Sequence, residues 1–521
     1  MIFGLLLRPT RLWRRLAGFT VAAMLGPLAV MCMPATALAG CGLPSDFDND
    51  GFSDVAVGEP WHPIDGDNLG GLRILYGSSS GVGIARNQYF DRSSAGMPEF
   101  AGGFGTSVVS GDFNGDCYAD LAAGRLKAPG DQAILIMFGS PTGITTADAL
   151  ALKAVDLLPE NPTAAQQLGK SLVSGDFDGD GSDDLVVSAE QLRSGSGMPG
   201  AVIVLYGSPG GLERRRIFSQ ATAGVPGTEE DPDFFGASLA AADFNGDGRD
   251  DLAAGVPGES IGNVVAAGGV TVLYGSVNGL TTTGARWIDQ NTAGVPGTVE
   301  SSDFIGYQVA AGDVTGDGYA DLIVGGLEDF ERIPVTVIDA GSVTVLTGGP
   351  TGISTSGAKA WHQDTAGVPG GNEAYDRFGI ALALGRFNGD NRLDLAVSAL
   401  HEDLSGQMDA GAVTVLYGTA TGLTSSGAKQ WSQDTDGIAG AAEEGDEFGS
   451  ALHAAGLGSG SLDSLIIGVD NERVVGLATI GMIHILRATT TGLTATASRT
   501  IRAADLVPGS PGEGEFGWCI G

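Results

Sequence analysis

The chain has 521 residues, a formal net charge of −35 and 86 glycines. So acidic a surface repels nucleic acid and anionic lipid and attracts cations, and we therefore expect no nucleic-acid partner. Average glycine usage is about 7%, and the excess over it indicates a chain rich in turns and poor in helix.

The N-terminus predicts a signal peptide over residues 1–39. Four arginines between positions 8 and 15 precede an apolar stretch over residues 16–33. Two cleavage patterns follow and both stay open: an A-x-A site at residues 37–39, and a lipobox that would leave Cys41 lipidated. The first is favoured because residues 34–36 separate the apolar stretch from the cysteine. We expect a secreted or cell-surface protein, attached to a membrane only if Cys41 is lipidated.

Five copies of a nine-residue acidic loop follow in the same phase. They read DFDNDGFSD from Asp46, DFNGDCYAD from Asp112, DFDGDGSDD from Asp176, DFNGDGRDD from Asp243 and DVTGDGYAD from Asp313. Their starts lie 64–70 residues apart. A period of this size, repeated this often, indicates an array of equivalent units that cannot bury their cores alone.

Oxygen-bearing side chains occupy positions 1, 3, 5 and 9 of each loop. Calcium takes six to eight oxygen ligands in a flexible geometry, so each short loop is expected to hold one ion. The predicted ligands, loop by loop, are Asp46, Asp48, Asp50, Asp54; Asp112, Asn114, Asp116, Asp120; Asp176, Asp178, Asp180, Asp184; Asp243, Asn245, Asp247, Asp251; and Asp313, Thr315, Asp317, Asp321.

Each unit also carries the signals of four short strands. A Phe-Gly or equivalent stands eight residues before the loop, and a short apolar run, such as residues 251–255, follows the loop. A second apolar run, such as the one around Val272, and a polar-aromatic run around Trp287 complete the unit. Four strands in each unit of about 70 residues are typical of a propeller blade. The three tryptophans in this last position, at 287, 361 and 431, could stack on sugars, but their shared phase favours packing within the blades.

Two further units are in register but carry degenerate loops. The loop from Arg386 keeps Asn388, Asp390 and Asp394, and we expect its guanidinium to replace a cation. The loop from Gly456 has no charged ligand. The sequence therefore predicts seven blades, of which five can bind calcium.

The two ends of the chain are predicted to share one blade. Phe516-Gly517 begins an eighth unit and then stops, whereas the first loop has no Phe-Gly before it. Joining them would close the ring and remove exposed strand edges. Cys41 and Cys519 occupy the same position of the repeat, so a Cys41–Cys519 disulfide is expected, which lipidation of Cys41 would forbid. Cys117 is expected to be a free thiol.

With these motifs in place, residues 41–521 resemble FG-GAP repeat proteins, best known from the seven-bladed propellers of integrin alpha subunits. The resemblance implies an all-β, seven-bladed propeller of four-stranded blades over residues 40–521. It also implies that the loops lie between the first and second strands of each blade and bind calcium structurally. The leg domains, inserted domain and membrane helix of integrins have no counterpart here, so integrin-type signalling is not implied.

The expected function is binding rather than catalysis. No catalytic constellation is visible, because the loops account for most of the acidic residues. We expect a monomer that binds a protein or glycan ligand at one face of the ring. A calcium-dependent lectin and, less favoured, a polysaccharide lyase or hydrolase are the alternatives. The acidic linkers 227–236, 297–306, 370–379 and 440–449 are either solvated turns or a ring that binds a cationic partner.

Overall fold

The computed structural model describes residues 43–60, 63–64, 67–68, 70–98, 104–125, 132–158, 167–192, 198–332, 335–458, 460–472, 481–506 and 516–521. The chain divides at Gly40, and the described residues all belong to the unit Cys41–Gly521. The predicted signal peptide and Cys41 lie outside the described residues. Among the residues that are described, no helix is both long enough and apolar enough to cross a membrane.

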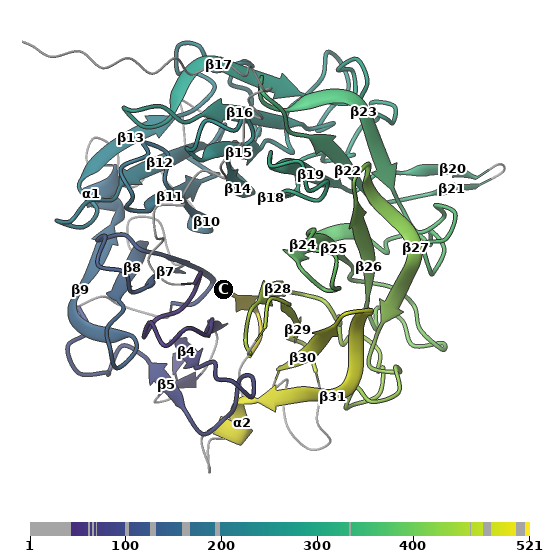
Figure 1. Ribbon diagram of the computed structural model, residues 1–521. Coiled ribbons are helices and arrows are strands. Elements are labelled where there is room, and N and C mark those ends of the chain that lie inside the picture. The colour runs from purple at the N-terminus through teal and green to yellow at the C-terminus, as the bar shows by residue number, and fades with distance from the viewer. Residues whose placement is uncertain are drawn as a thin grey trace, which may run out of the picture. The chain divides into compact units, whose positions relative to one another are not determined.

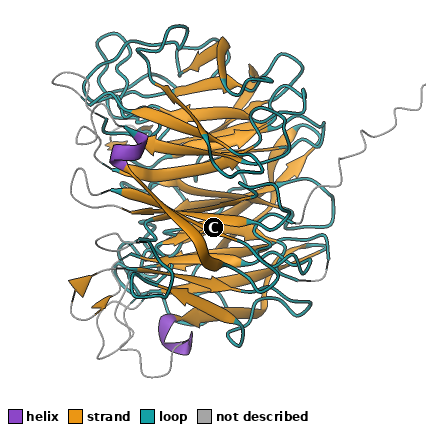
Figure 2. Ribbon diagram, turned by 90° about the vertical axis from the view of Figure 1, so that its left-hand side faces the viewer, coloured by secondary structure: helices purple, strands orange, loops and turns teal. Residues whose placement is uncertain are grey.

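The second unit is an all-β propeller of seven four-stranded antiparallel sheets, as predicted (Figure 1). Its two described helices are single turns, α1 (Ala154–Leu157) and α2 (Ala503–Leu506), among the strands that make up the rest of the regular structure (Figure 2).

Each blade consists of four strands that follow one another from the centre of the ring outward. The first is β32 (Cys519–Ile520), β1 (Val55–Glu59), β4 (Gly71–Leu75), β5 (Asn87–Phe90); the second β6 (Ser107–Gly111), β7 (Asp120–Arg125), β8 (Ala133–Phe138), β9 (Thr145–Lys153); and the third β10 (Leu168–Gly175), β11 (Asp184–Ala189), β12 (Ala201–Tyr206), β13 (Arg214–Phe218). The fourth is β14 (Leu239–Ala242), β15 (Asp251–Gly255), β16 (Val270–Tyr274), β17 (Thr281–Ile288), and the fifth β18 (Gln308–Gly312), β19 (Asp321–Gly326), β22 (Ser342–Thr347), β23 (Ser354–Trp361). The sixth is β24 (Phe378–Gly385), β25 (Asp394–Ala399), β26 (Ala412–Thr419), β27 (Gly422–Trp431), and the seventh β28 (Leu452–Ala455), β29 (Ser464–Val469), β30 (Met482–Thr489), β31 (Gly492–Arg502). Two small hairpins, β2 (Pro63–Ile64) with β3 (Asp67–Asn68) and β20 (Phe330–Arg332) with β21 (Val335–Val337), are additions to the first and fifth units.

The core lies between neighbouring blades. Strands such as β11 and β12 are buried along their whole length, which explains their continuous apolar runs. Val202 of the third blade packs in one cluster with Leu252 and Leu273 of the fourth. Each cluster draws on two blades, so no blade can bury its apolar surface alone.

The Phe-Gly motif is explained by close backbone contact between blades. Gly306 has φ +85°, and a Cβ there would lie 2.3 Å from the Gly269 oxygen and 3.2 Å from the Gly255 Cα. Gly255 ends β15 of the preceding blade, and a Cβ on it would lie 2.0 Å from the Gly306 oxygen. The two glycines therefore require each other, since any side chain would push the blades apart.

The last strand closes the ring, as predicted. β32 pairs with β1 through Val57↔Ile520 and Gly58↔Cys519. The preceding Gly517 packs against the seventh blade, where a Cβ on Gly468 would lie 2.4 Å from its oxygen. One short segment thus completes the first blade and contacts the last.

The cysteine predictions were wrong. Cys519 is a free thiol that donates a hydrogen bond to the Gly105 oxygen at 3.0 Å, so there is no Cys41–Cys519 disulfide. Cys117, expected to be free, is disulfide-bonded, and its partner lies outside the described residues. Repeat phase places a residue along a blade, but the direction of its side chain decides its pairing, and that of Cys519 faces the second blade.

Candidate functional site

All five acidic loops lie at the same place in their blades. The loop from Asp112 joins β6 to β7, and the loops from Asp176, Asp243 and Asp313 join the same pair of strands in the next three blades. The loop from Asp46 leads into β1, whose inner neighbour is β32. Because strand order and direction are the same in every blade, the five loops share one face of the ring.

The first aspartate curls each loop around its own carboxylate. Asp243 Oδ1 accepts hydrogen bonds from the N–H groups of Gly246 (2.6 Å) and Asp247 (3.2 Å), and Oδ2 accepts one from Gly248 (2.8 Å). The carboxylate of Asp176 makes the same three contacts in its own loop. This arrangement turns the side chains at positions 3 and 5 back toward position 1.

The ninth aspartate is buried and fastens the loop to the blade. Asp251 Oδ2 accepts the Phe244 N–H at 3.0 Å, and its Oδ1 accepts the Gly275 N–H at 2.8 Å. Burial raises the pKa of this carboxyl to about 7, because its apolar surroundings disfavour the charge. The same cause raises the pKa of Asp54, Asp120 and Asp184 to about 8 and that of Asp321 to about 6.

The donor set of the loops fits a hard divalent cation. Carboxylate oxygens of Asp46, Asp48 and Asp50 lie within 4.8 Å of one another, and so do those of Asp176, Asp178 and Asp184. Oxygen ligands in these numbers suit calcium or magnesium and not a soft metal. In the fifth loop the Thr315 hydroxyl donates to Asp313 Oδ1 at 3.1 Å. That Thr315 is a metal ligand stays a prediction.

The sixth loop keeps the backbone function without the full ligand set. Asp394 accepts the N–H groups of Phe387 and Gly418, both at 2.9 Å, like the ninth aspartate elsewhere. Arg386 replaces the first carboxylate, and its backbone N–H donates to Asp463 of the seventh loop at 2.8 Å. That its guanidinium replaces a cation stays a prediction.

The acidic linkers are mostly exposed turns, and each is anchored by one buried aspartate. In each, a buried aspartate accepts the N–H of the glutamate three residues before it: Asp233, Asp303, Asp376 and Asp446. A glutamine that ends the blade before each linker donates to a buried glutamate of the next blade: Gln220 to Glu259, Gln290 to Glu328, Gln363 to Glu402 and Gln433 to Glu472. These four pairs join five successive blades, the third to the seventh, on the face opposite the acidic loops.

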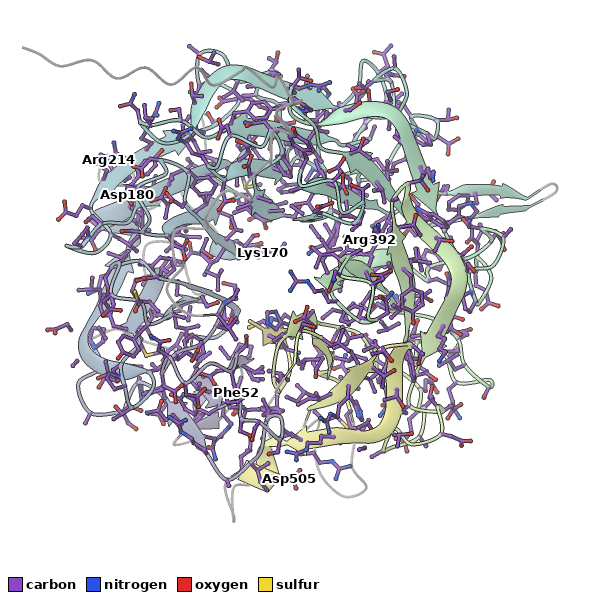
Figure 3. The ribbon with its side chains drawn as sticks, in the orientation of Figure 1. Phe52, Lys170, Asp180, Arg214, Arg392 and Asp505 are labelled. Carbon is purple, nitrogen blue, oxygen red and sulfur yellow. The ribbon has the colours of Figure 1, made fainter. Side chains whose placement is uncertain are left out.

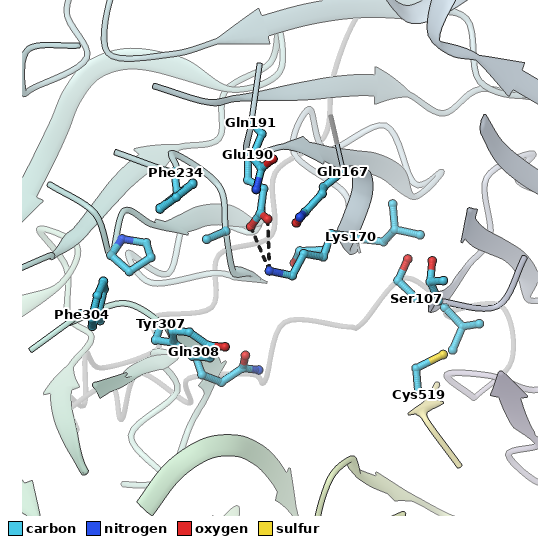
Figure 4. A pocket seen from close by; sticks show the side chains of 16 residues that line it. Ser107, Gln167, Lys170, Glu190, Gln191, Phe234, Phe304, Tyr307, Gln308 and Cys519 are labelled. Carbon is cyan, nitrogen blue, oxygen red and sulfur yellow. Dashed lines mark hydrogen bonds and ion pairs between the residues drawn. The ribbon is translucent and has the colours of Figure 1, made fainter. Parts of the chain in front are cut away.

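A cavity of about 450 Å³ opens among the inner strands on that opposite face (Figure 4). Its lining includes Lys170, Glu190, Phe234, Phe304 and Tyr307. Lys170 projects toward the centre of the ring (Figure 3), and its Nζ lies 3.1 and 3.3 Å from the two Glu190 carboxylate oxygens. Burial raises the pKa of Glu190, and the lysine opposes that shift.

The sequence did not single out these cavity residues. Each stands next to a Phe-Gly motif or just after a second strand, where positions vary from blade to blade. Backbone conformation marks some of them, since the residue before the motif has positive φ in Gln167, Phe234 and Phe304. Strained conformations of this kind gather at functional sites. Of the three sugar-stacking candidates, Trp361 and Trp431 are buried at 8% and 5% exposure. Trp287 is half-buried and packs against the cluster between the third and fourth blades.

Comparison with known proteins agrees with the repeat. The family model for the FG-GAP repeat matches residues 168–205, 235–273 and 305–346. Integrin alpha-PS2 of Drosophila melanogaster is 32% identical over 198 residues, which cover 37% of this chain and 12% of that protein. The human phosphatidylinositol-glycan-specific phospholipase D is 27% identical over 225 residues, which cover 41% of this chain and 26% of that protein. The matches thus span about a quarter or less of the length of these relatives.

Among solved structures, the AofleA protein of Arthrobotrys oligospora aligns with 10% identity and a TM-score of 0.38, covering 73% of this chain and 83% of that one. That score is too low to support a functional argument. Three matched repeats, integrin alpha relatives and seven blades agree with one another. The chain carries FG-GAP repeats in its third, fourth and fifth blades and is similar in sequence to integrin alpha subunits.

Proposed function

We propose that this chain is an exported, calcium-stabilised propeller that acts as a binding or adhesion module. The observation that carries the proposal is the five-fold recurrence of one loop fold, with oxygen donors at the same four positions. The loops connect the first and second strands, so an ion bound there would stiffen the scaffold and leave the opposite face for a ligand.

Calcium would be held by the side chains at positions 1, 3, 5 and 9 of each competent loop. The charge of the bound ion would offset the repulsion among these carboxylates, which the protein alone leaves close together. Native mass spectrometry of the exported chain tests this, because five bound calcium ions are expected in calcium and none in chelator. A chain that binds no calcium contradicts the proposal.

The cavity at the ring centre is the candidate ligand site. It combines exposed aromatic surface, with Tyr307 41% exposed, and a Lys170–Glu190 pair that offers both donors and acceptors. Ligands recovered from the native medium should bind the unmodified chain and lose affinity on Tyr307→Ala or Lys170→Met. Val277→Ala, at an exposed apolar residue in the outer hairpin of the fourth blade and outside the cavity, is the control. Equal binding by all three variants would place the ligand elsewhere.

A glycan-binding lectin is the second candidate. An aromatic face beside paired polar groups can hold a sugar ring by stacking and by hydrogen bonds to its hydroxyls. A glycan array probed in calcium should give hits that Tyr307→Ala removes, and an array without hits would leave a protein ligand as the only candidate. We propose no enzymatic activity, and the phospholipase D relatives do not supply one, because the match covers only 26% of the human protein.

Export itself rests on the leader. Intact-mass analysis of the exported protein should find a chain that begins at Gly40, whereas an acylated chain that begins at Cys41 would establish the lipoprotein alternative. We propose a monomer, since β32 pairs with the inner edge of β1 and only the short outer edge of each blade is left.

A further inference from the structure

In two of the five acidic loops, a predicted ligand is contacted by an arginine that lies elsewhere in the same blade. Arg86 Nη2 contacts Asp48 Oδ2 in the first loop, and Arg86 Nη1 lies 3.5 Å from Asp50 Oδ2. In the third loop, Arg214 Nη2 donates to Asp178 Oδ2 at 2.6 Å. The Asp48 and Asp178 side chains are only 3% and 10% exposed, so each arginine reaches a largely buried predicted ligand.

The two arginines occupy the same position of the blade. Arg214 pairs with Tyr206 across β12 and β13, and the Arg86 carbonyl oxygen accepts the N–H of Tyr76 at the corresponding place. Each guanidinium lies over its tyrosine ring, at 4.2 Å for Arg86 and 4.3 Å for Arg214. Figure 3 places Arg214 and Asp180 at the outer edge of the third blade. The tyrosine holds the cation beside the loop.

The other five blades have an uncharged side chain at this position: Thr145, Thr281, Ser354, Thr424 and Thr494. Two further arginines lie near the fourth and fifth loops, but they contact them differently. Arg249 lies 3.4 Å from Asp247, whose side chain is 41% exposed, and Arg392 donates to the backbone oxygen of Thr315. Neither contacts a buried carboxylate ligand.

The first and third loops are also those in which three carboxylates are found within 4.8 Å of one another among the described residues. A guanidinium can bring like-charged carboxylates together because it is a permanent, delocalised cation with several donors. The coincidence indicates that the arginine acts there in place of the metal charge.

We infer that Arg86 and Arg214 are internal counter-cations that weaken calcium binding by the first and third loops. The inference rests on the proposed calcium function and adds its regulation. The loops from Asp112, Asp243 and Asp313 fill first as calcium rises, and the two arginine-bearing loops fill only at higher calcium. When calcium is low, the guanidinium keeps those two loops ordered.

The test is a calcium titration of the full chain, monitored by isothermal titration calorimetry and by native mass spectrometry. The unmodified chain should show three tighter and two weaker sites. One positive charge about 5 Å from a divalent ion in a water-like medium changes affinity by about tenfold. The double variant Arg86→Thr/Arg214→Thr should therefore bind calcium about tenfold more tightly at the two weaker sites. Threonine already occupies this position in other blades.

Three matched variants separate charge from damage. Arg214→Lys keeps the charge and should keep the weak site. Arg216→Thr removes a charge from the same strand at a residue that bonds the Leu280 oxygen, and it should change no site. Thr281→Arg, beside Tyr274 in the fourth blade, should weaken a tight site by the same factor.

Two outcomes distinguish the role of the arginines from calcium binding itself. Chains that bind calcium with the same affinities in every variant would overturn the role of the arginines alone. Chains that bind no calcium in any form would overturn both.

Discussion

The ninth-position aspartates have a backbone role that does not depend on any ion. Asp251 is fully buried and accepts two N–H groups, whereas the predicted ligand Asp247 in the same loop is 41% exposed. The two residues therefore allow the structural and the metal-binding parts of one loop to be separated.

Asp251→Asn should destabilise the protein with or without calcium. In the variant an NH2 group replaces one carboxylate oxygen and faces a buried N–H. This lowers the free energy of unfolding by about 1–3 kcal/mol. Asp247→Asn should reduce the free energy of unfolding only when calcium is present. Urea denaturation in calcium and in chelator measures both, and equal behaviour of the two variants would contradict this division of roles.

The inter-blade glutamates should make stability depend on pH. Burial raises the pKa of Glu259 to about 7; the Gln220 hydrogen bond opposes this, and the nearby carboxylates of Asp233 and Glu230 add to it. The folded protein then holds this proton more tightly than the unfolded chain does. The contribution of Glu259 to stability therefore falls as pH rises from about 4.5 to about 7.

Glu259→Gln stays neutral and can still accept from Gln220. At pH 8 the variant should be more stable than the unmodified protein by about 2 kcal/mol, since each pKa unit is worth about 1.4 kcal/mol and solvent at the partly open site screens part of the shift. At pH 4 the two should be equal. Urea denaturation at both pH values checks this, with the exposed Glu213→Gln as control; a difference independent of pH would refute it.

At the scale of the element, the contact between glycines of adjacent blades determines how closely the sheets pack. Gly306→Ala should cost about 2–4 kcal/mol, because it combines a left-handed backbone with overlap against another backbone. Gly357→Ala is the matched control, with φ +81° and no atom within 4 Å of the added Cβ. It should cost only about 1–2 kcal/mol. Thermal unfolding of the two variants measures the difference, and equal losses would mean that the inter-blade contact is not tight.

The elements themselves were largely predictable from the sequence, because each strand and loop recurs in one phase. The residues between them were not. Arg86 and Asp48 are far apart along the chain and meet only through the hairpin register of the first blade. Gln220 and Glu259 belong to different blades and meet only where the third and fourth blades pack together, although nearly the same spacing recurs in the three later pairs. Cys519 was mispaired because its side-chain direction depends on packing against the second blade.

For the whole molecule, ring closure depends on six residues at the C-terminal end. Phe516 is fully buried and packs with Ile466 and Ile483 of the seventh blade, while β32 completes the first. Phe516→Ala should cost about 3–5 kcal/mol. Deletion of residues 516–521 should cost more and promote association, since it exposes the edge of β1. Calorimetry and light scattering measure these effects, and a deletion variant with unchanged melting would show that closure adds no stability.

We propose that calcium in the five loops stabilises the propeller. The most direct measurement is thermal unfolding of the exported chain in calcium and after chelation. Calcium at about 100 times its Kd adds about 2.7 kcal/mol per site, because it binds the folded state and not the unfolded chain. We expect chelation to lower Tm by about 5 °C or more and added calcium to restore it. A Tm that does not change on chelation would contradict the claim.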